Sequence, residues 1–87
     1  MQSTNETTTI NMSMPILKVG TSGEAVRFLQ QVLIALGYSI PFDAVFGNKT
    51  KKAVEKFQKA HSLEVDCVVG QKTWRALGDA ILKLAAS

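Results

Sequence analysis

The chain has 87 residues, of which 46% are hydrophobic and 20% are charged, and its formal net charge is +3. This length suits one domain, and the composition is that of a globular protein, which excludes a fibrous or wholly disordered chain. Cys67 is the only cysteine, so an intramolecular disulfide is excluded and packing alone must stabilise the fold. No apolar run approaches the roughly twenty residues that a membrane-spanning helix needs.

The chain begins with a polar stretch. Residues 1–14 are rich in Ser, Thr and Asn, and they are unlike a secretory signal because they have neither a basic flank nor an apolar centre. The composition changes at Pro15, after which apolar residues become frequent. We therefore expect a disordered polar tail over residues 1–15 and one folded domain over residues 16–87.

The first helical pattern lies between Ser22 and Gly37. Its apolar residues recur at spacings of three and four, which marks one buried helix face: Val26, Leu29, Leu33 and Leu36. The Ser22 side chain can accept a hydrogen bond from an early backbone N–H, and Gly37 suits the left-handed conformation that closes many helices. Both ends of this helix are therefore predicted.

Two further helical patterns follow. The second runs from Asn48 to about Ala60, with its lysines outward and four residues inward: Ala53, Val54, Phe57 and Ala60. The third starts near Gln71 and carries Trp74 and Leu77. We expect Gly78 to break or kink it, and residues 79–86 to continue as a last helical segment.

The sequence also contains an internal repeat. Residues 43–54 (DAVFGNKTKKAV) align with residues 66–77 (DCVVGQKTWRAL) at a constant offset of 23 residues. In each copy the Asp can bond nearby backbone N–H groups in a turn, the Val two residues later is expected to point inward, and the Gly lets the chain reverse before a helix. The prediction is an all-α, three-helix core with an internal loop-helix duplication.

These residues together resemble the peptidoglycan-binding domain family. The resemblance covers about Leu17 to Leu77 and depends on this spaced series: Leu17, Gly20, Gly23, Val26, Leu29-Gln30, Leu33, Leu36-Gly37-Tyr38, the two repeats, Phe57-Gln58, Leu63 and Thr73-Trp74. It implies a compact orthogonal three-helix bundle, usually appended to wall hydrolases such as amidases, muramidases and spore-cortex enzymes. The sequence departs from the family's usual Asp-Gly at Asp43-Ala44 and Asp66-Cys67, and Ser62 stands where a Gly is frequent.

The resemblance implies a non-catalytic module that binds peptidoglycan, through glycan or stem peptide, and tethers a partner such as a wall hydrolase. It also implies the cell wall or periplasm as the location, although no signal peptide is visible. We expect a monomer without a cofactor, a nucleic-acid partner or a membrane span. The alternative is a protein-interaction or inhibitory module, because propeptides with a similar helical fold cover the catalytic groove of some extracellular proteases; their signature cysteine motif is absent here.

We predict a ligand groove in the first repeat, because loops held by helices carry recognition more often than packed faces do. The rings there would stack on a ligand, and Lys49 with Thr50 would meet a stem-peptide carboxylate at a helix N-terminus. The predicted site residues are Tyr38, Phe42, Asp43, Phe46, Lys49 and Thr50.

Several residues have two possible roles. Trp74 is either part of the core or a sugar-stacking platform, while we assign Phe28, like Phe57, to packing. Residues 49–59 carry a local charge of +4, which is either a solvated helix face or a patch for an anionic partner. Because Phe57 is the only aromatic residue of that stretch and is expected to face the core, base stacking is not expected.

Catalytic and metal-binding roles are not predicted. His61 is the only histidine and has no second ligand at helical spacing, so we expect neither a metal site nor a general base. Asp43 and Asp66 occupy equivalent positions in the repeat, which favours loop-tying roles over an acid/base pair. Cys67 is expected to be a half-buried small residue.

Overall fold

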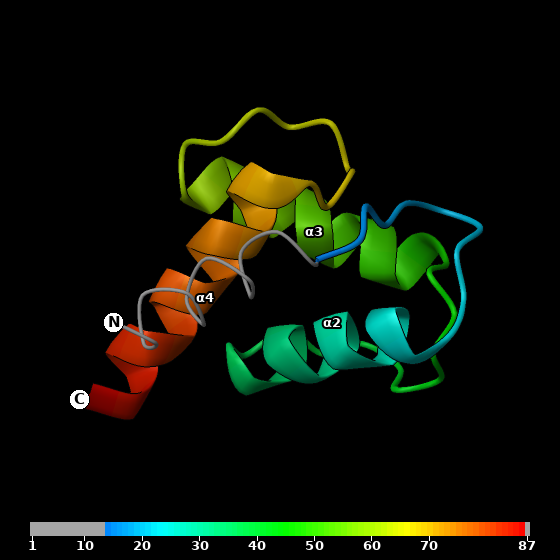
Figure 1. The fold of residues 1–87 in the computed structure, drawn as a ribbon, viewed down its shortest axis with the longest axis horizontal. Helices are drawn as coiled ribbons and strands as arrows, with labels where there is room; N and C mark the ends of the chain where they lie inside the picture. The colour runs from blue at the N-terminus through cyan, green and yellow to red at the C-terminus, as the bar shows by residue number, and fades with distance from the viewer. Residues whose placement is uncertain (1–13, 87) are drawn as a thin grey trace, which may run out of the picture.

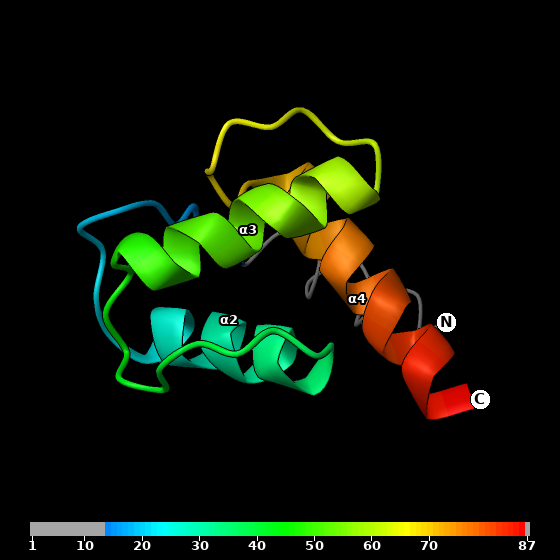
Figure 2. The ribbon, with the colours of Figure 1, turned by 180° about the vertical axis from the view of Figure 1, so that it is seen from behind.

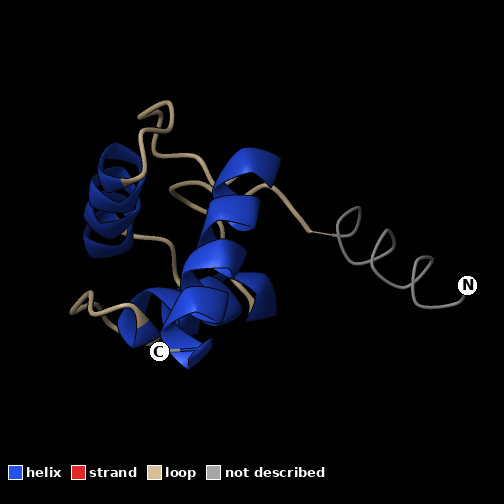
Figure 3. Ribbon diagram, turned by 90° about the vertical axis from the view of Figure 1, so that its left-hand side faces the viewer, coloured by secondary structure: helices blue, strands red, loops and turns tan. Residues whose placement is uncertain are grey.

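The computed structural model describes residues 14–86. Within this range it contains three helices and no strand: α2 (Glu24–Ala35), α3 (Asn48–Ala60) and α4 (Gln71–Ala86) (Figures 1 and 3). The predicted all-α, three-helix fold is confirmed. Residues 1–13 of the expected tail lie outside the described residues. None of the helices in residues 14–86 is long and apolar enough to cross a membrane.

Helix α2 packs against both other helices, and α4 runs obliquely past them (Figures 1 and 2). The segment before α2 contributes to this packing, because Leu17 and Val69 exchange two backbone hydrogen bonds of 3.1 and 2.8 Å. The loop that leads into α4 is thereby joined to the start of the described chain. The buried apolar core comes from all of these elements: Leu17, Val26, Leu29, Leu33, Phe46, Ala53, Val54, Phe57, Val69, Trp74 and Leu77.

The start of α2 differs from the prediction. The residue that precedes the helix is Gly23, with φ 120°, and no side chain caps the first turn. Ser22 instead forms an isolated β-bridge with Val45, and the Gly23 N–H donates to the Ala44 carbonyl at 2.9 Å. The prediction that Ser22 caps the helix is wrong, because this long-range pairing fixes its backbone in an extended conformation.

The end of α2 is as predicted. Gly37 has φ 106°, its N–H donates to the Ile34 carbonyl at 3.0 Å, and the Tyr38 N–H donates to the Leu33 carbonyl at 3.0 Å. This pair of bonds is the Schellman motif, in which a left-handed residue satisfies the last carbonyl groups of a helix.

The end of α3 has the same hydrogen bonds around a different residue. The N–H of Ser62 donates to the Lys59 carbonyl at 3.3 Å, and that of Leu63 donates to the Gln58 carbonyl at 2.8 Å. Ser62 has φ 58°, so a residue with a Cβ occupies the left-handed position where glycine is preferred.

The predicted bounds of α3 are confirmed, with one correction on its buried face: Ala60, expected to point inward, is exposed at the end of the helix. Helix α4 is longer than predicted, because it continues through Gly78 to Ala86. A single glycine weakens a helix by about 1 kcal/mol but removes no backbone hydrogen bond, so the residues on either side keep the helix continuous.

The register of the two loops also differs from the prediction. Val45 was expected to point inward and is 50% exposed, whereas its neighbour Phe46 is buried. In the second loop Val69 is buried and Val68 only half-buried. The Phe46 N–H donates to the Thr21 carbonyl at 2.9 Å. Because successive side chains in extended backbone point to opposite sides, this pairing turns Phe46 into the core and Val45 outward.

Candidate functional site

A buried glutamine organises the loop before α3. Gln30 of α2 donates through Nε2 to Asp43 Oδ1 at 3.0 Å, to the Val45 carbonyl at 3.0 Å and to Thr50 Oγ1 at 3.1 Å. Its Oε1 accepts from the N–H groups of Asp43 at 3.0 Å and Ala44 at 2.9 Å. One side chain therefore joins α2, the loop and the first turn of α3.

A second buried glutamine organises the loop before α4. Gln58 of α3 donates through Nε2 to Asp66 Oδ1 at 2.9 Å, to the Val68 carbonyl at 3.0 Å and to Thr73 Oγ1 at 3.1 Å. Its Oε1 accepts from the Cys67 N–H at 3.0 Å. The two loops share four of these hydrogen bonds, and only the first has the bond from the aspartate N–H to the glutamine Oε1. The duplication of complete loop-helix units stays a prediction.

The same bonds hold two residues in an unusual backbone conformation. Ala44 has φ 63° and Cys67 has φ 60°, the left-handed region that disfavours residues with a Cβ. These are the positions where the sequence departs from the usual Asp-Gly. In each loop the N–H of the left-handed residue bonds to the buried glutamine, so the hydrogen bonds offset the backbone strain.

The two aspartates are hydrogen-bond acceptors within their loops. Bonds from the Gln30 side chain and the Val45 N–H lower the pKa of Asp43. The Val68 N–H is the main cause of the lowered pKa of Asp66, and the Gln58 side chain adds to it. Carboxylates held in this way stay ionised, which supports the loop-tying role and not that of a general acid.

The structure places two predicted site residues in the interior. Phe46 is 1% exposed within the core, and Thr50 is 2% exposed and bonded to Gln30. The expectation that Phe46 offers a stacking surface and that Thr50 meets a carboxylate is wrong. The cause is the pairing of the loop with the segment before α2, which turns Phe46 inward and brings Thr50 to Gln30.

The other four predicted residues are at least partly accessible. Tyr38 is half-buried against the core, while Asp43 and Lys49 are exposed. Phe42 is 53% exposed, and the Arg27 guanidinium carbon lies 5.6 Å from its ring centroid, within the range of a cation–π contact. As a ligand site these four residues stay a prediction.

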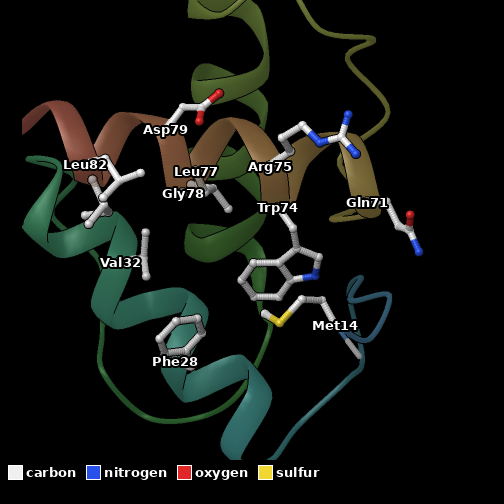
Figure 4. Close-up of a pocket in the computed structure, with 11 residues that line it drawn as sticks. Met14, Phe28, Val32, Gln71, Trp74, Arg75, Leu77, Gly78, Asp79 and Leu82 are labelled. Atoms are coloured by element: carbon white, nitrogen blue, oxygen red, sulfur yellow. The ribbon is translucent and has the colours of Figure 1, made fainter. Parts of the chain in front are cut away.

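A cavity of about 440 Å³ lies between α2 and α4 (Figure 4). We call it the α2–α4 groove. Its apolar lining residues are Met14, Phe28, Val32, Trp74, Leu77, Ile81 and Leu82. The polar residues beside them are Gln71, Arg75 and Asp79, all exposed. A cavity of this size, mainly apolar with a few polar groups, is typical of small-ligand sites.

Two aromatic rings meet in this groove. Phe28 of α2 stacks on Trp74 of α4 with ring centroids 5.9 Å apart and an interplanar angle of 27° (Figure 4). The indole Nε1 of Trp74 donates to the Pro15 carbonyl at 2.6 Å, and the Trp74 side chain is buried. Phe28 is 49% exposed, so the expectation that it serves only packing needs correction. Phe28, and not Trp74, offers the more accessible ring.

The groove was missed in the sequence, although a signal for it exists. Val26, Leu29 and Leu33 define the buried face of α2, and Phe28 and Val32 are four residues apart on another side of the helix. At about 100° per residue, Phe28 and Val26 are separated by about 160° around the helix axis. This second apolar pair indicates a further contact surface on α2.

Residues 22–77 match the family model described as "Putative peptidoglycan binding domain". The chain is 43% identical over 65 residues to the N-acetylmuramoyl-L-alanine amidase CwlL of Bacillus licheniformis, an alignment that covers 71% of this chain and 18% of the amidase. The chain thus spans less than a fifth of that relative.

Solved structures agree with this match. A peptidoglycan-binding protein from Clostridioides difficile, in complex with glutamine hydroxamate, superposes with a TM-score of 0.73 at 40% identity, over 75% of this chain and 41% of that one. The SleB N-terminal domain superposes with a TM-score of 0.75 at 39% identity, over 78% of this chain and 94% of that domain. The family match, the shared identity and the common fold together show that this chain belongs to the peptidoglycan-binding domain family.

Proposed function

We propose that this chain is a non-catalytic module that binds peptidoglycan through the α2–α4 groove and holds a partner wall enzyme close to its substrate. The observation that supports this most is the half-exposed Phe28 ring, which lies in one cavity with Gln71, Arg75 and Asp79. Binding here would place the module outside the cytoplasm, at the wall.

The chemistry of the groove suits a glycan or a stem peptide. The apolar face of a sugar ring can pack on the Phe28 ring, as other apolar groups pack on aromatic faces. Hydroxyl and amide groups of the ligand can then bond to Gln71 and Asp79. Arg75 can form a bidentate pair with a stem-peptide carboxylate, because its planar guanidinium matches the two oxygens.

The relatives support the tethering part of the proposal. CwlL is named as an amidase, and the matched segment is a small part of its length. A weak binder linked to a catalytic domain raises the local concentration of substrate without taking part in the reaction. In that role the module needs only a specific, reversible contact with the wall.

One observation favours a second surface for ligand contact, on the loop before α3. Phe42 is exposed and held beside Arg27 in the loop that also carries Asp43, so this loop can present a ring and a charge to the same ligand. We propose Tyr38, Phe42, Asp43 and Lys49 as this secondary surface. The contribution of this secondary surface to binding can be measured separately from that of the groove.

The test compares two aromatic residues of equal exposure. Phe28→Ala and Phe42→Ala each remove a half-exposed ring, the first from the groove and the second from the loop. Pelleting with purified peptidoglycan sacculi, on proteins shown to be folded by circular dichroism, measures the binding of each. We expect Phe28→Ala to weaken binding at least tenfold, or about 1.4 kcal/mol, and Phe42→Ala to weaken it less.

Other results would revise the proposal. A larger loss with Phe42→Ala would move the main site to the loop. If folded wild-type protein fails to pellet with sacculi at all, the wall-binding proposal is wrong, and the alternative of a protein-interaction module on this fold would replace it.

A further inference from the structure

The outer face of α3 carries a row of lysines. Lys49, Lys52, Lys56 and Lys59 are spaced by three, four and three residues, which brings them onto one side of a helix. They span about 15 Å at 1.5 Å per residue and occupy an arc of about 80°. All four are exposed, and we call them the lysine row.

Within residues 14–86 the lysine row has one acidic neighbour and no ion pair. None of its four side chains takes part in an ion pair there. Glu55 is the only acidic residue of α3, and it borders the row, three residues from Lys52 and four from Lys59. Four positive charges and one negative charge therefore share the exposed side of α3, and the centre of the row lies about 130° around the helix from the buried face formed by Ala53, Val54 and Phe57.

The residue types in the row suit the binding of phosphate groups. Both arginines of the chain, Arg27 and Arg75, lie on other helices, so the row offers ammonium groups and no guanidinium. A lysine ammonium acts as a point charge and binds phosphate in any orientation. Evenly spaced point charges suit a linear polymer whose phosphates repeat along a flexible backbone.

Two other phosphate-bearing partners fit less well. Single-stranded nucleic acids are held by aromatic side chains on which bases stack, and Phe57, the only aromatic residue of α3, is 1% exposed. An amphipathic helix binds a membrane by inserting its apolar face, and the apolar face of α3 is already buried in the core. A phosphodiester chain without bases is the ligand that remains.

We infer that the lysine row is a binding site distinct from the groove, for a base-free phosphodiester polymer carried by the wall, such as a polyol-phosphate chain. This inference rests on the proposed wall-binding function, because it assumes that the module works where such a polymer lies beside peptidoglycan. The row lies on α3, whereas the groove residues come from α2, α4 and the start of the described chain. The two sites can therefore act independently.

The test uses two kinds of sacculi and two charge-matched variants. Sacculi that carry a phosphodiester-linked polymer are compared with the same sacculi after hydrofluoric acid has cleaved the phosphodiesters. Lys52→Gln/Lys56→Gln removes two charges from the row, and Lys18→Gln/Lys72→Gln removes two charges from exposed positions elsewhere. Binding of a purified polyol-phosphate polymer in solution is measured in parallel at 50 and 200 mM salt.

We expect wild type and Lys18→Gln/Lys72→Gln to bind the untreated sacculi at least tenfold more tightly than the treated ones. The row variant should lose most of this difference, because only two lysines of the row remain. If four lysines contact phosphates, affinity for the soluble polymer should fall about 50-fold between 50 and 200 mM salt, against about 7-fold for the row variant, by the counterion-release relation for single strands.

The inference would be overturned if wild type bound both kinds of sacculi equally, or if both variants lost the same amount of affinity for the untreated sacculi. It would also be overturned if wild type bound single-stranded DNA or anionic vesicles tenfold more tightly than the polymer. Failure of the proposed function has a different signature. In that case treated sacculi do not bind wild type, whereas binding to the soluble polymer still depends on the lysine row.

Discussion

Gln30 and Gln31 are neighbours in α2 with opposite surroundings, because Gln30 is buried and Gln31 is exposed. In Gln30→Ala the Thr50 hydroxyl and the Ala44 N–H lose their partner. We expect this variant to lower the free energy of unfolding by about 2–4 kcal/mol, because unsatisfied buried polar groups are costly. Gln31→Ala should change it by less than about 0.5 kcal/mol. Urea denaturation measures both, and equal values would contradict the role assigned to Gln30.

Substitution of Ser62, the left-handed residue after α3, is expected to stabilise the fold. Ser62→Gly should raise the free energy of unfolding by about 0.5–1 kcal/mol, because glycine adopts positive φ without strain. Gly37→Ala, at the matching position after α2, should lower it by a similar amount or more. Thermal unfolding would show shifts of roughly 2–8 °C in the two directions. A destabilised Ser62→Gly would show that the serine side chain contributes there.

The loop aspartates predict a dependence on pH. The pKa values of Asp43 and Asp66 are lowered in the folded state from the usual value of 3.8. Their contribution is therefore present above the unfolded pKa and is lost as pH falls through the lower folded pKa. Stability should decrease below about pH 4, and less so in Asp43→Asn/Asp66→Asn. Unfolding midpoints measured from pH 6 to 2 test this, and parallel curves for both proteins would contradict it.

At the scale of elements, α4 contains a glycine that its structure does not require. Apart from its chain neighbours and the nearby backbone of its own helix, no atom lies within 4 Å of the position that a Cβ at Gly78 would take, and the residue lies inside a continuous helix. Gly78→Ala should therefore raise the free energy of unfolding by about 0.8–1 kcal/mol. Denaturant unfolding followed by circular dichroism measures this. A loss of stability would show that α4 needs the glycine at this point.

Local sequence patterns predicted which segments form helices better than they predicted how α2 begins and which loop residues are buried. The period of apolar residues located α3 from Asn48 to Ala60, and Gly37 marked the end of α2. The start of α2 was missed because a bridge to Val45, more than twenty residues away, decides the backbone at Ser22. The same pairing decides that Phe46 and not Val45 is buried, and no local pattern records it.

At the scale of the whole molecule, the accessible surfaces depend on contacts between distant segments. The indole of Trp74 is fixed by the Pro15 carbonyl and by the ring of Phe28, which come from two other parts of the chain. The groove could not be predicted from one element because α2 and α4 each supply only part of it. Of the predicted loop site, Phe42 and Asp43 are exposed because neither side chain packs into the core.

Trp74 is the only tryptophan of the chain and lines the groove, so its fluorescence reports on the proposed site directly. The decisive measurement is a titration of the folded chain with soluble glycan-peptide fragments of peptidoglycan while Trp74 emission is recorded. We predict a saturable change in emission. The fragment concentration at its midpoint should be at least tenfold higher for Phe28→Ala than for wild type, and Phe42→Ala should raise it less. Fragments that bind, as shown by calorimetry, without changing Trp74 emission would contradict binding in the α2–α4 groove.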